Sequence, residues 1–192
     1  MKEMKKWKIV ALCTVLACLA IVASGTLAYF TAQETAHNVI TSGGVDIQLI
    51  EQTRNEDGSL GPWKNMEDVM PGAEISKIVT VKNTGASAAW VRVSVTKTIT
   101  LARGVQGTPD PSLLELNINT TDWTEQGGYY YYNHSLLPGE TTKPLFTTVT
   151  FAPEMGNMYQ NSKAEIEVKA DAVQVANNGA TVLEAAGWPA SK

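Results

Sequence analysis

The sequence predicts an all-β protein, an antiparallel jelly-roll β-sandwich that follows an N-terminal signal helix. Two observations support this prediction. Apolar and polar side chains alternate along several short runs, with the period of two expected of half-buried strands. Clusters of Gly, Pro, Asn and Asp separate the runs, and none of the runs has a helical stripe of apolar residues. Short strands between frequent turns are typical of sandwiches and jelly rolls.

The chain begins with a predicted export signal over residues 1–28. Four lysines form a positive n-region, an apolar stretch covers residues 9–24, and the small side chains of Thr26 and Ala28 suit the pocket of a signal peptidase. We therefore predict cleavage between Ala28 and Tyr29. Removal of 28 of the 192 residues leaves 164, which is enough to bury the core of one domain.

Two alternatives for this segment stay open. The stretch over residues 7–30 is long enough to cross a bilayer of ~30 Å, which allows an uncleaved membrane anchor. Cys18 follows Val15-Leu16-Ala17 in the way that the lipid-bearing cysteine of a lipoprotein does, although the residues after it are apolar where a polar tether is usual.

Alternation predicts the strands of one sandwich domain over residues 29–176. These strands cover residues 45–49, 75–82, 90–101, 129–132, 147–151 and 165–172. Pro71-Gly72 is a turn that leads into the second strand, since Pro fixes φ and Gly accepts a positive φ, and Asn83-Thr84-Gly85 ends that strand. Residues 177–192 are predicted to form a weakly structured tail with a short helix over residues 182–186.

The mature chain is acidic and has no cysteine. Removal of the signal takes four lysines and one glutamate, which leaves 11 basic and 18 acidic residues and a net charge of −7. Without a Lys/Arg cluster no nucleic-acid partner is expected, and contact with a membrane is expected only through the signal before cleavage. Because Cys13 and Cys18 lie in the signal, no disulfide or thiolate site is expected after cleavage.

Four motifs carry a resemblance to a known family. They are Gly25-Thr26-Leu27-Ala28-Tyr29-Phe30-Thr31, Ser42-Gly43-Gly44-Val45-Asp46-Ile47, Met70-Pro71-Gly72-Ala73-Glu74 and Val81-Lys82-Asn83-Thr84-Gly85. With this ordered series the chain resembles the TasA/camelysin family of exported proteins of Gram-positive bacteria. Residues 128–132 and 137–141 resemble clostridial members of the family more weakly.

The resemblance implies a jelly-roll fold, processing by a dedicated signal peptidase, and a location in the extracellular matrix or at the surface of a Gram-positive cell. For the best understood members it also implies assembly into biofilm-matrix fibres. The chain itself is then the main partner, and an accessory or anchor matrix protein is a further one. The turn motifs are expected to serve the fold and not a reaction.

A fibre needs a sheet edge that pairs with a strand of the next copy. Jelly rolls keep edge strands with unpaired N–H and C=O groups, and a head-to-tail contact at such an edge propagates instead of closing. The natural donor is the new N-terminus, and its expected contact residues are Tyr29, Phe30, Thr31, Ala32, Val39 and Ile40. The alternative is that this segment is the first strand of its own sheet.

No enzyme site, no metal site and no cofactor are predicted. The two histidines, His37 and His134, lie in no His-Glu-x-x-His helix, so the usual zinc site of a metalloprotease is absent from the sequence. A camelysin-like metalloprotease is therefore only the third interpretation of the chain. The acidic run over residues 55–59 lacks the ligand series of an EF-hand loop and is interpreted as a solvated hairpin tip.

An aromatic cluster is the strongest remaining candidate for a binding surface. It consists of Trp123, Tyr129, Tyr130, Tyr131 and Tyr132. Alternation puts Tyr129 and Tyr131 on one face of a strand and the other two tyrosines on the opposite face, so only one pair belongs to the core. The exposed pair would stack on glycan, support a subunit contact, or merely cover a sheet face. This surface defines the main rival to a fibre protein, a monomeric cell-surface binding module.

Overall fold

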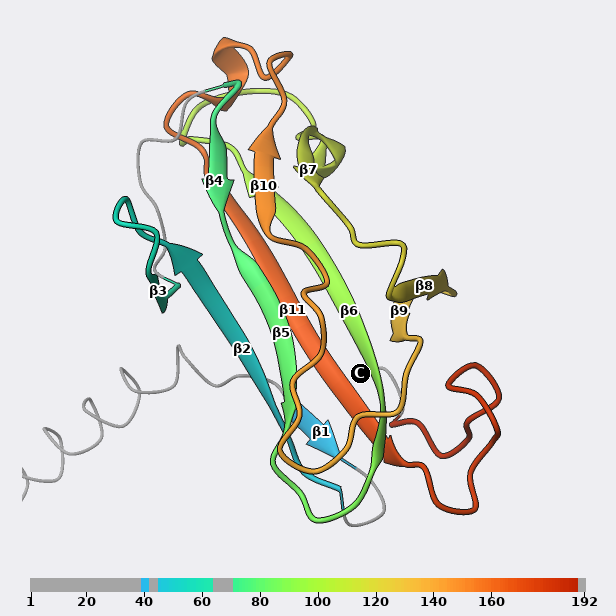
Figure 1. Cartoon of the computed structure of the whole chain (residues 1–192). Helices are drawn as coiled ribbons and strands as arrows, with labels where there is room; N and C mark the ends of the chain where they lie inside the picture. Colours follow the sequence, from blue (N-terminus) through green and yellow to red (C-terminus); the bar gives the residue numbers. More distant parts are fainter. Residues whose placement is uncertain (1–38, 42–44, 64–70, 190–192) are drawn as a thin grey trace, which may run out of the picture. The chain divides into compact units, whose positions relative to one another are not determined.

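The computed structural model describes residues 39–41, 45–63 and 71–189, all within one compact unit, His37–Lys192. The regular secondary structure of the described chain is almost entirely β-strand, mostly in antiparallel sheets, with almost no helix (Figure 1), so the prediction of an all-β fold is confirmed. The predictions that concern residues 1–38, among them the signal and its cleavage site, lie outside the described residues.

The described chain contains eleven strands and two short 3-10 helices. In chain order these are β1 (Val39–Thr41), β2 (Ile47–Arg54), β3 (Leu60–Pro62), β4 (Glu74–Ser76), β5 (Ile78–Asn83), β6 (Ala89–Thr100), η2 (Pro111–Leu113), β7 (Leu114–Leu116), β8 (Trp123–Gln126), β9 (Tyr129–Tyr132), β10 (Thr148–Phe151), η3 (Asn157–Tyr159) and β11 (Lys163–Gln174).

The first layer is a five-stranded sheet in the order β1-β11-β6-β9-β8 (Figure 1). β6 and β11 are antiparallel and pair along their whole length, from Thr100 beside Lys163 to Ala89 beside Gln174. Because side chains alternate across a strand, the valines at odd-numbered positions of β6 face the main core, and Trp90 faces the opposite side of the sheet.

The second layer consists of two three-stranded sheets, β3-β2-β5 and β4-β10-β7. The sequence predicts a single strand over residues 75–82, but the chain changes sheet at Lys77, between β4, which pairs with β10, and β5, which pairs with β2. Backbone hydrogen bonds hold the chain at this break to the segment before β10. The Lys77 N–H donates to Thr147 O, and the Val79 N–H donates to Phe146 O.

Lys77 fixes this junction with its side chain. The residue is 3% exposed, and its Nζ lies 2.6 Å from Glu51 Oε1 and 4.4 Å from the centre of the Trp63 ring. Burial lowers the pKa of the Lys77 amine, and the Glu51 carboxylate acts in the opposite direction. The ion pair therefore ties β2 to the point where the chain passes from one sheet to the next.

The main hydrophobic core lies between the two layers. Val79 and Val81 of β5 belong to the same cluster as Val91 and Val93 of β6, and all four residues are fully buried. The largest fully buried side chains of this cluster are Trp123, Phe146, Leu136 and Leu145. A core shared by facing sheets makes the domain sandwich-like.

The Asn83-Thr84-Gly85 motif is explained by the fold. Asn83 is fully buried, and its Nδ2 donates to Ser87 O and Leu136 O, both at 2.8 Å. Its Oδ1 accepts a hydrogen bond from the Gly85 N–H at 2.9 Å. A Cβ on Gly85 would lie 2.7 Å from Asp46 N, so a side chain at this position would clash with the backbone.

One strand pair differs from the predicted antiparallel arrangement. β1 is parallel to β11, with Val39 beside Ala170 and Thr41 beside Ala172. The other strand pairs of the described chain are antiparallel. Alternation fixes the face on which a side chain lies but not the direction of the neighbouring strand, which is why the sequence pattern did not indicate this pair.

The C-terminal segment, residues 175–189, also differs from the predicted tail. No helix forms over residues 182–186, and residues 182–184 make a turn instead, since so short a segment does not hold a helix without tertiary support. Val182 is only 3% exposed and packs in one cluster with Trp90 and Val173 on the outer face of the five-stranded sheet. The segment therefore covers part of that face.

Candidate functional site

The predicted donor segment enters the described chain at β1. Val39 and Ile40 belong to this strand, whereas residues 29–32 lie outside the described residues. β1 is an edge strand of the five-stranded sheet and pairs with β11 only at residues 170–172. So short a strand is held by few backbone hydrogen bonds, each of which contributes about 0.5–1.5 kcal/mol net. Exchange of β1 for the same strand of another copy therefore has a small cost in free energy.

The edge of β11 continues beyond β1. The Val175 N–H donates to Ala88 O, so the odd-numbered residues of β11 direct their backbone groups toward β6 and the even-numbered ones toward β1. Ala164, Ile166 and Val168 therefore direct their N–H and C=O groups to the β1 side, where none of the described strands pairs with them. An edge of this kind accepts an added strand.

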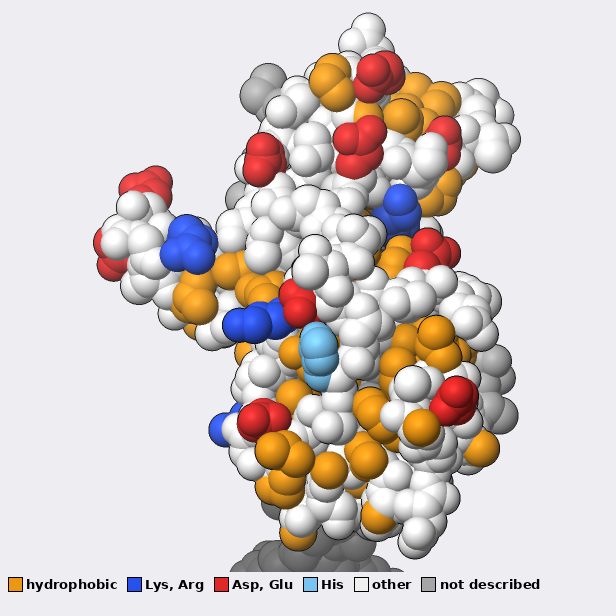
Figure 2. Space-filling view, turned by 45° about the vertical axis from the view of Figure 1, so that its right-hand side comes forward, with side chains coloured by type: hydrophobic (Ala, Val, Ile, Leu, Met, Phe, Trp, Pro, Cys, Tyr) orange, Lys and Arg blue, Asp and Glu red, His pale blue; other side chains and the backbone are white. Residues whose placement is uncertain are grey.

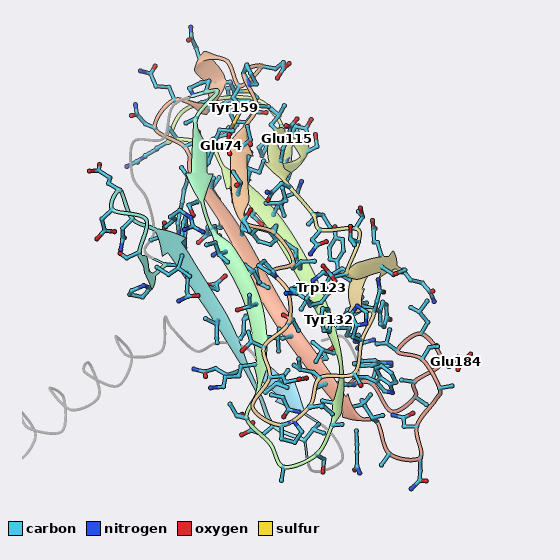
Figure 3. All side chains as sticks on the ribbon, in the orientation of Figure 1. Glu74, Glu115, Trp123, Tyr132, Tyr159 and Glu184 are labelled. Carbon is cyan, nitrogen blue, oxygen red and sulfur yellow. The ribbon has the colours of Figure 1, made fainter. Side chains whose placement is uncertain are left out.

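The tyrosine strand β9 lies between β6 and β8. On its inner face Tyr132 packs against Trp123, with 5.0 Å between the ring centres (Figure 3). Trp123 is 1% exposed and Tyr132 is 7% exposed, and Tyr130 packs half-buried against the same core. The prediction that these residues belong to a surface patch is corrected for Trp123 and Tyr132, because cross-strand pairing places both rings in the core.

Tyr130 combines a half-buried ring with a phenol near a carboxylate. Burial raises the pKa of this phenol, and the negative charge of Glu125 raises it further. A phenol is already protonated at neutral pH at the ordinary pKa of 10.0, so the raised pKa keeps this hydroxyl a hydrogen-bond donor further into the alkaline range.

Tyr129 and Tyr131 lie on the outer face, beside Arg92. The guanidinium carbon of Arg92 is 3.8 Å from the centre of the Tyr129 ring and 4.8 Å from that of Trp188. Trp188 also meets Tyr131 edge-on, with 5.7 Å between ring centres. We call Tyr129, Tyr131 and Trp188 the outer aromatic surface; all three are half-buried.

Sequence reasoning missed Arg92 and Trp188. Alternation groups Arg92 with Ser94 and Thr96 on a polar face, and it does not show that the C-terminal segment returns to cover this end of the strand. Arg92 Nη2 donates to Pro189 O at 2.7 Å, which fixes the segment there. The only signal in the sequence is Asp171, an opposite charge on the polar face of the other long strand.

Within the described ranges no group of three or more His, Cys, Asp or Glu side chains could hold a metal ion. His134 is exposed, with Nε2 3.7 Å from Asp122 Oδ1 and its ring against that of Tyr132. His37 lies outside the described residues.

The acidic run over residues 55–59 is the exposed tip of the β2–β3 hairpin, as predicted. Asp57 Oδ1 accepts hydrogen bonds from the Ser59 hydroxyl and the Ser59 N–H, and both lower the pKa of the Asp57 carboxyl. Figure 2 shows the end of this hairpin projecting from the rest of the molecule, with charged side chains of both signs. The carboxylate is thus engaged in the turn itself.

In the part of the chain that the structure describes, no helix is long and apolar enough to cross a membrane. The resemblance to the TasA/camelysin family stays a prediction from sequence motifs. Comparisons of the chain with family models, with curated proteins and with solved structures find no match.

Proposed function

We propose that this chain is a secreted structural protein of the extracellular or biofilm matrix of a Gram-positive bacterium, and that it assembles into fibres by donating its processed N-terminal strand. The observation that carries the proposal is the position of β1. This end of the predicted donor segment is an edge strand that pairs with three residues of a twelve-residue partner. A strand held so briefly is suited to exchange between copies.

A β1 strand from a second copy would pair with the same edge of β11. In the register of the present pair, Val39 would lie beside Ala170 and Ile40 beside Asp171, and the upstream residues would follow the edge past Val168. Since the donated strand and the accepting edge are different surfaces, each contact is head-to-tail and propagates. The jelly-roll connectivity, the dedicated signal peptidase and an anchor or accessory matrix protein belong to this proposal through the family resemblance.

Electron microscopy with size-exclusion chromatography tests the proposal. The mature chain that starts at Tyr29 is compared with the same chain carrying a polar extension before Tyr29. Fibres from the free N-terminus alone are expected, and a chain that lacks residues 29–35 should not polymerise. Stable monomers from every form would contradict strand donation.

The outer aromatic surface favours a second candidate, a monomeric cell-surface binding module. Its half-buried rings are held in place by packing on the Arg92 guanidinium, and aromatic rings that are fixed in this way suit stacking on sugar rings. Titration of the monomer with cell-wall glycans tests this candidate. Tyr129→Ala should weaken binding. Tyr159→Ala, a matched change in the 3-10 helix η3, should leave the affinity unchanged.

A further inference from the structure

One side chain closes the loop formed by residues 178–186, here called the C-terminal loop. Asn178 Oδ1 accepts a hydrogen bond from the Ala186 N–H at 2.8 Å, and Asn178 Nδ2 donates to Ala186 O at 3.0 Å. This two-way contact joins the ends of the loop in the manner of a compact Ω-loop. Inside the loop, the Ala180 N–H donates to Glu184 Oε2 at 3.1 Å.

The same residue connects the C-terminal loop to the sheet. Asn178 O accepts a hydrogen bond from Trp90 Nε1 at 2.9 Å, and Val182 of the loop packs with Trp90 and Val173. Figure 1 shows the chain after β11 turning back at the end of that strand, and Figure 3 labels Glu184 in this loop. Closure of the loop and its contact with the sheet therefore both depend on Asn178.

The fold also requires glycine at the next position. Gly179 has a φ of +63°, and a Cβ there would lie 2.9 Å from Ala185 N and from Glu184 C. Its N–H donates no hydrogen bond within the described residues. Asn178-Gly179 is the only Asn-Gly pair in the sequence. Asn178 closes the loop with its side chain, and Gly179 adopts a φ that disfavours other residues.

An asparagine followed by glycine is chemically labile, because no side chain hinders attack by the next backbone nitrogen on the amide carbon. We propose that Asn178 is a site of spontaneous deamidation and that this modification releases the C-terminal loop. Gly179 N bonds to Asn178 Cγ, the bond from Cγ to Nδ2 breaks, and ammonia leaves with the proton of the Gly179 amide. Water then opens the cyclic imide to give aspartate or isoaspartate at position 178, with no change of oxidation state.

The product cannot close the loop as asparagine does. The Nδ2 donor to Ala186 O is lost, and a carboxylate oxygen takes its place opposite that carbonyl, so two acceptors face each other. Isoaspartate also inserts an extra backbone carbon at position 178, where the two ends of the loop meet. As the loop opens, Val182 leaves the cluster that it forms with Trp90 and Val173, and their apolar surface becomes accessible to solvent.

The test follows the full mature chain as it ages in mildly alkaline buffer. Peptide mass spectrometry measures conversion at Asn178 and at Asn177, an exposed neighbour that precedes asparagine instead of glycine. Conversion is expected at Asn178 alone, and a protease added briefly should cleave residues 176–189 only in the converted fraction. The variant Asn178→Asp should be cleaved there about ten- to hundredfold faster, as expected when a hydrogen-bonded partner is lost, and Asn177→Asp should match the unmodified chain.

Two outcomes would overturn the proposal. Conversion at Asn178 in the urea-unfolded chain but none in the folded chain would mean that the hydrogen bonds between Asn178 and Ala186 protect the amide. Equal cleavage of converted and unconverted wild-type chains would mean that the loop stays closed after modification. Because this second comparison uses aged wild-type protein, it does not depend on the folding of any variant.

Discussion

Arg92 and Asp171 face each other across β6 and β11 and form a buried ion pair, with 2.8 Å between Arg92 Nε and Asp171 Oδ2. The two residues are 7% and 8% exposed. Tyr129 and Trp188 stack on the guanidinium group, and Pro189 O accepts a hydrogen bond from Arg92 Nη2. The pair thus joins the two longest strands to the C-terminal segment.

Removing one partner of this ion pair is expected to lower the free energy of unfolding more than replacing both partners with uncharged residues. Asp171→Ala leaves a buried guanidinium without its counter-ion and should lower the free energy of unfolding by about 3 kcal/mol. Adding Arg92→Met to that variant should recover part of the loss, which a double-mutant cycle in urea would measure. Strictly additive effects of the two changes would show that the charges do not interact.

Asn83 is expected to be the most sensitive polar residue of the core. Asn83→Ala leaves Ser87 O without a donor inside the fold and removes one of the two donors to Leu136 O, which keeps the Ala89 N–H. The change should cost about 2–4 kcal/mol, from about 1–3 kcal/mol for the unsatisfied carbonyl and about 1 kcal/mol for the other lost hydrogen bond. Asn133 is a control of the same residue type, since its side chain makes two hydrogen bonds but is exposed. Asn133→Ala should cost less than about 1 kcal/mol in the same urea titration; similar losses for both would contradict this account.

Trp123 and Tyr129 are expected to differ in their contribution to stability, because Trp123 lies in the core and Tyr129 lies on the outer face. Trp123→Ala should destabilise the domain by about 3–5 kcal/mol, because it empties a fully buried site beside Tyr132. Tyr129→Ala removes a half-buried ring and should cost about 1 kcal/mol. Thermal unfolding followed by circular dichroism distinguishes the two, and a large loss for Tyr129→Ala would place that ring in the structural core.

The lowered pKa of Lys77 predicts that the free energy of unfolding rises with pH in the alkaline range. Burial lowers its pKa in the folded chain below the ordinary value of 10.5, so the unfolded chain binds the proton more tightly. Through the alkaline window below pH 10.5 the unfolded state therefore holds more protons, and the free energy of unfolding increases with pH. Below the folded pKa both states are protonated and this contribution is constant.

A variant without the two charges isolates this effect. Lys77→Met combined with Glu51→Gln removes the amine and its carboxylate partner together, so no buried charge is left unpaired. Urea midpoints measured across the alkaline range should rise for the wild-type chain relative to this variant. Parallel pH profiles of the two proteins would show that the folded pKa of Lys77 is not lowered.

An engineered disulfide can hold β1 on its own β11. Val39 and Ala170 pair across adjacent strands, and neighbouring strands lie about 4.8 Å apart, within the Cα range of a disulfide. Both natural cysteines lie in the predicted signal, so the mature Val39→Cys/Ala170→Cys chain would form a single bridge. We expect fibres by electron microscopy only after reduction, and each single-cysteine variant should polymerise in both states. Fibres from the oxidised, internally bridged chain would exclude donation of β1.

The strand pattern could be predicted because alternation reports directly which residues are half-buried. β6 and β11 keep their apolar side chains on one face for most of their length, so their existence and their inner faces follow from the sequence. The division of residues 75–82 could not be predicted in this way. The period of two places Ile75 and Val79 on the same face, although the chain changes its pairing partner at Lys77 between them. These two positions therefore give no sign of the break.

The candidate site was less predictable, because it depends on contacts between segments far apart in the sequence. Alternation divides the four tyrosines into two pairs, but only Trp123 beneath Tyr132 decides which pair faces the core. Likewise, nothing local indicates that Trp188 returns to Arg92, nearly a hundred positions earlier in the chain. The outer aromatic surface is therefore a product of tertiary structure.

The long pairing of β6 with β11 has a mechanical consequence. A pull along these strands would load all twelve residue pairs together in shear, whereas a pull across them would separate the pairs one after another. In a filament stretched along the strand axis, the subunit interior would then carry tension across its longest ladder. Rupture would begin at the shorter contact of the donated strand, so that an overloaded filament parts between subunits while each subunit keeps its fold.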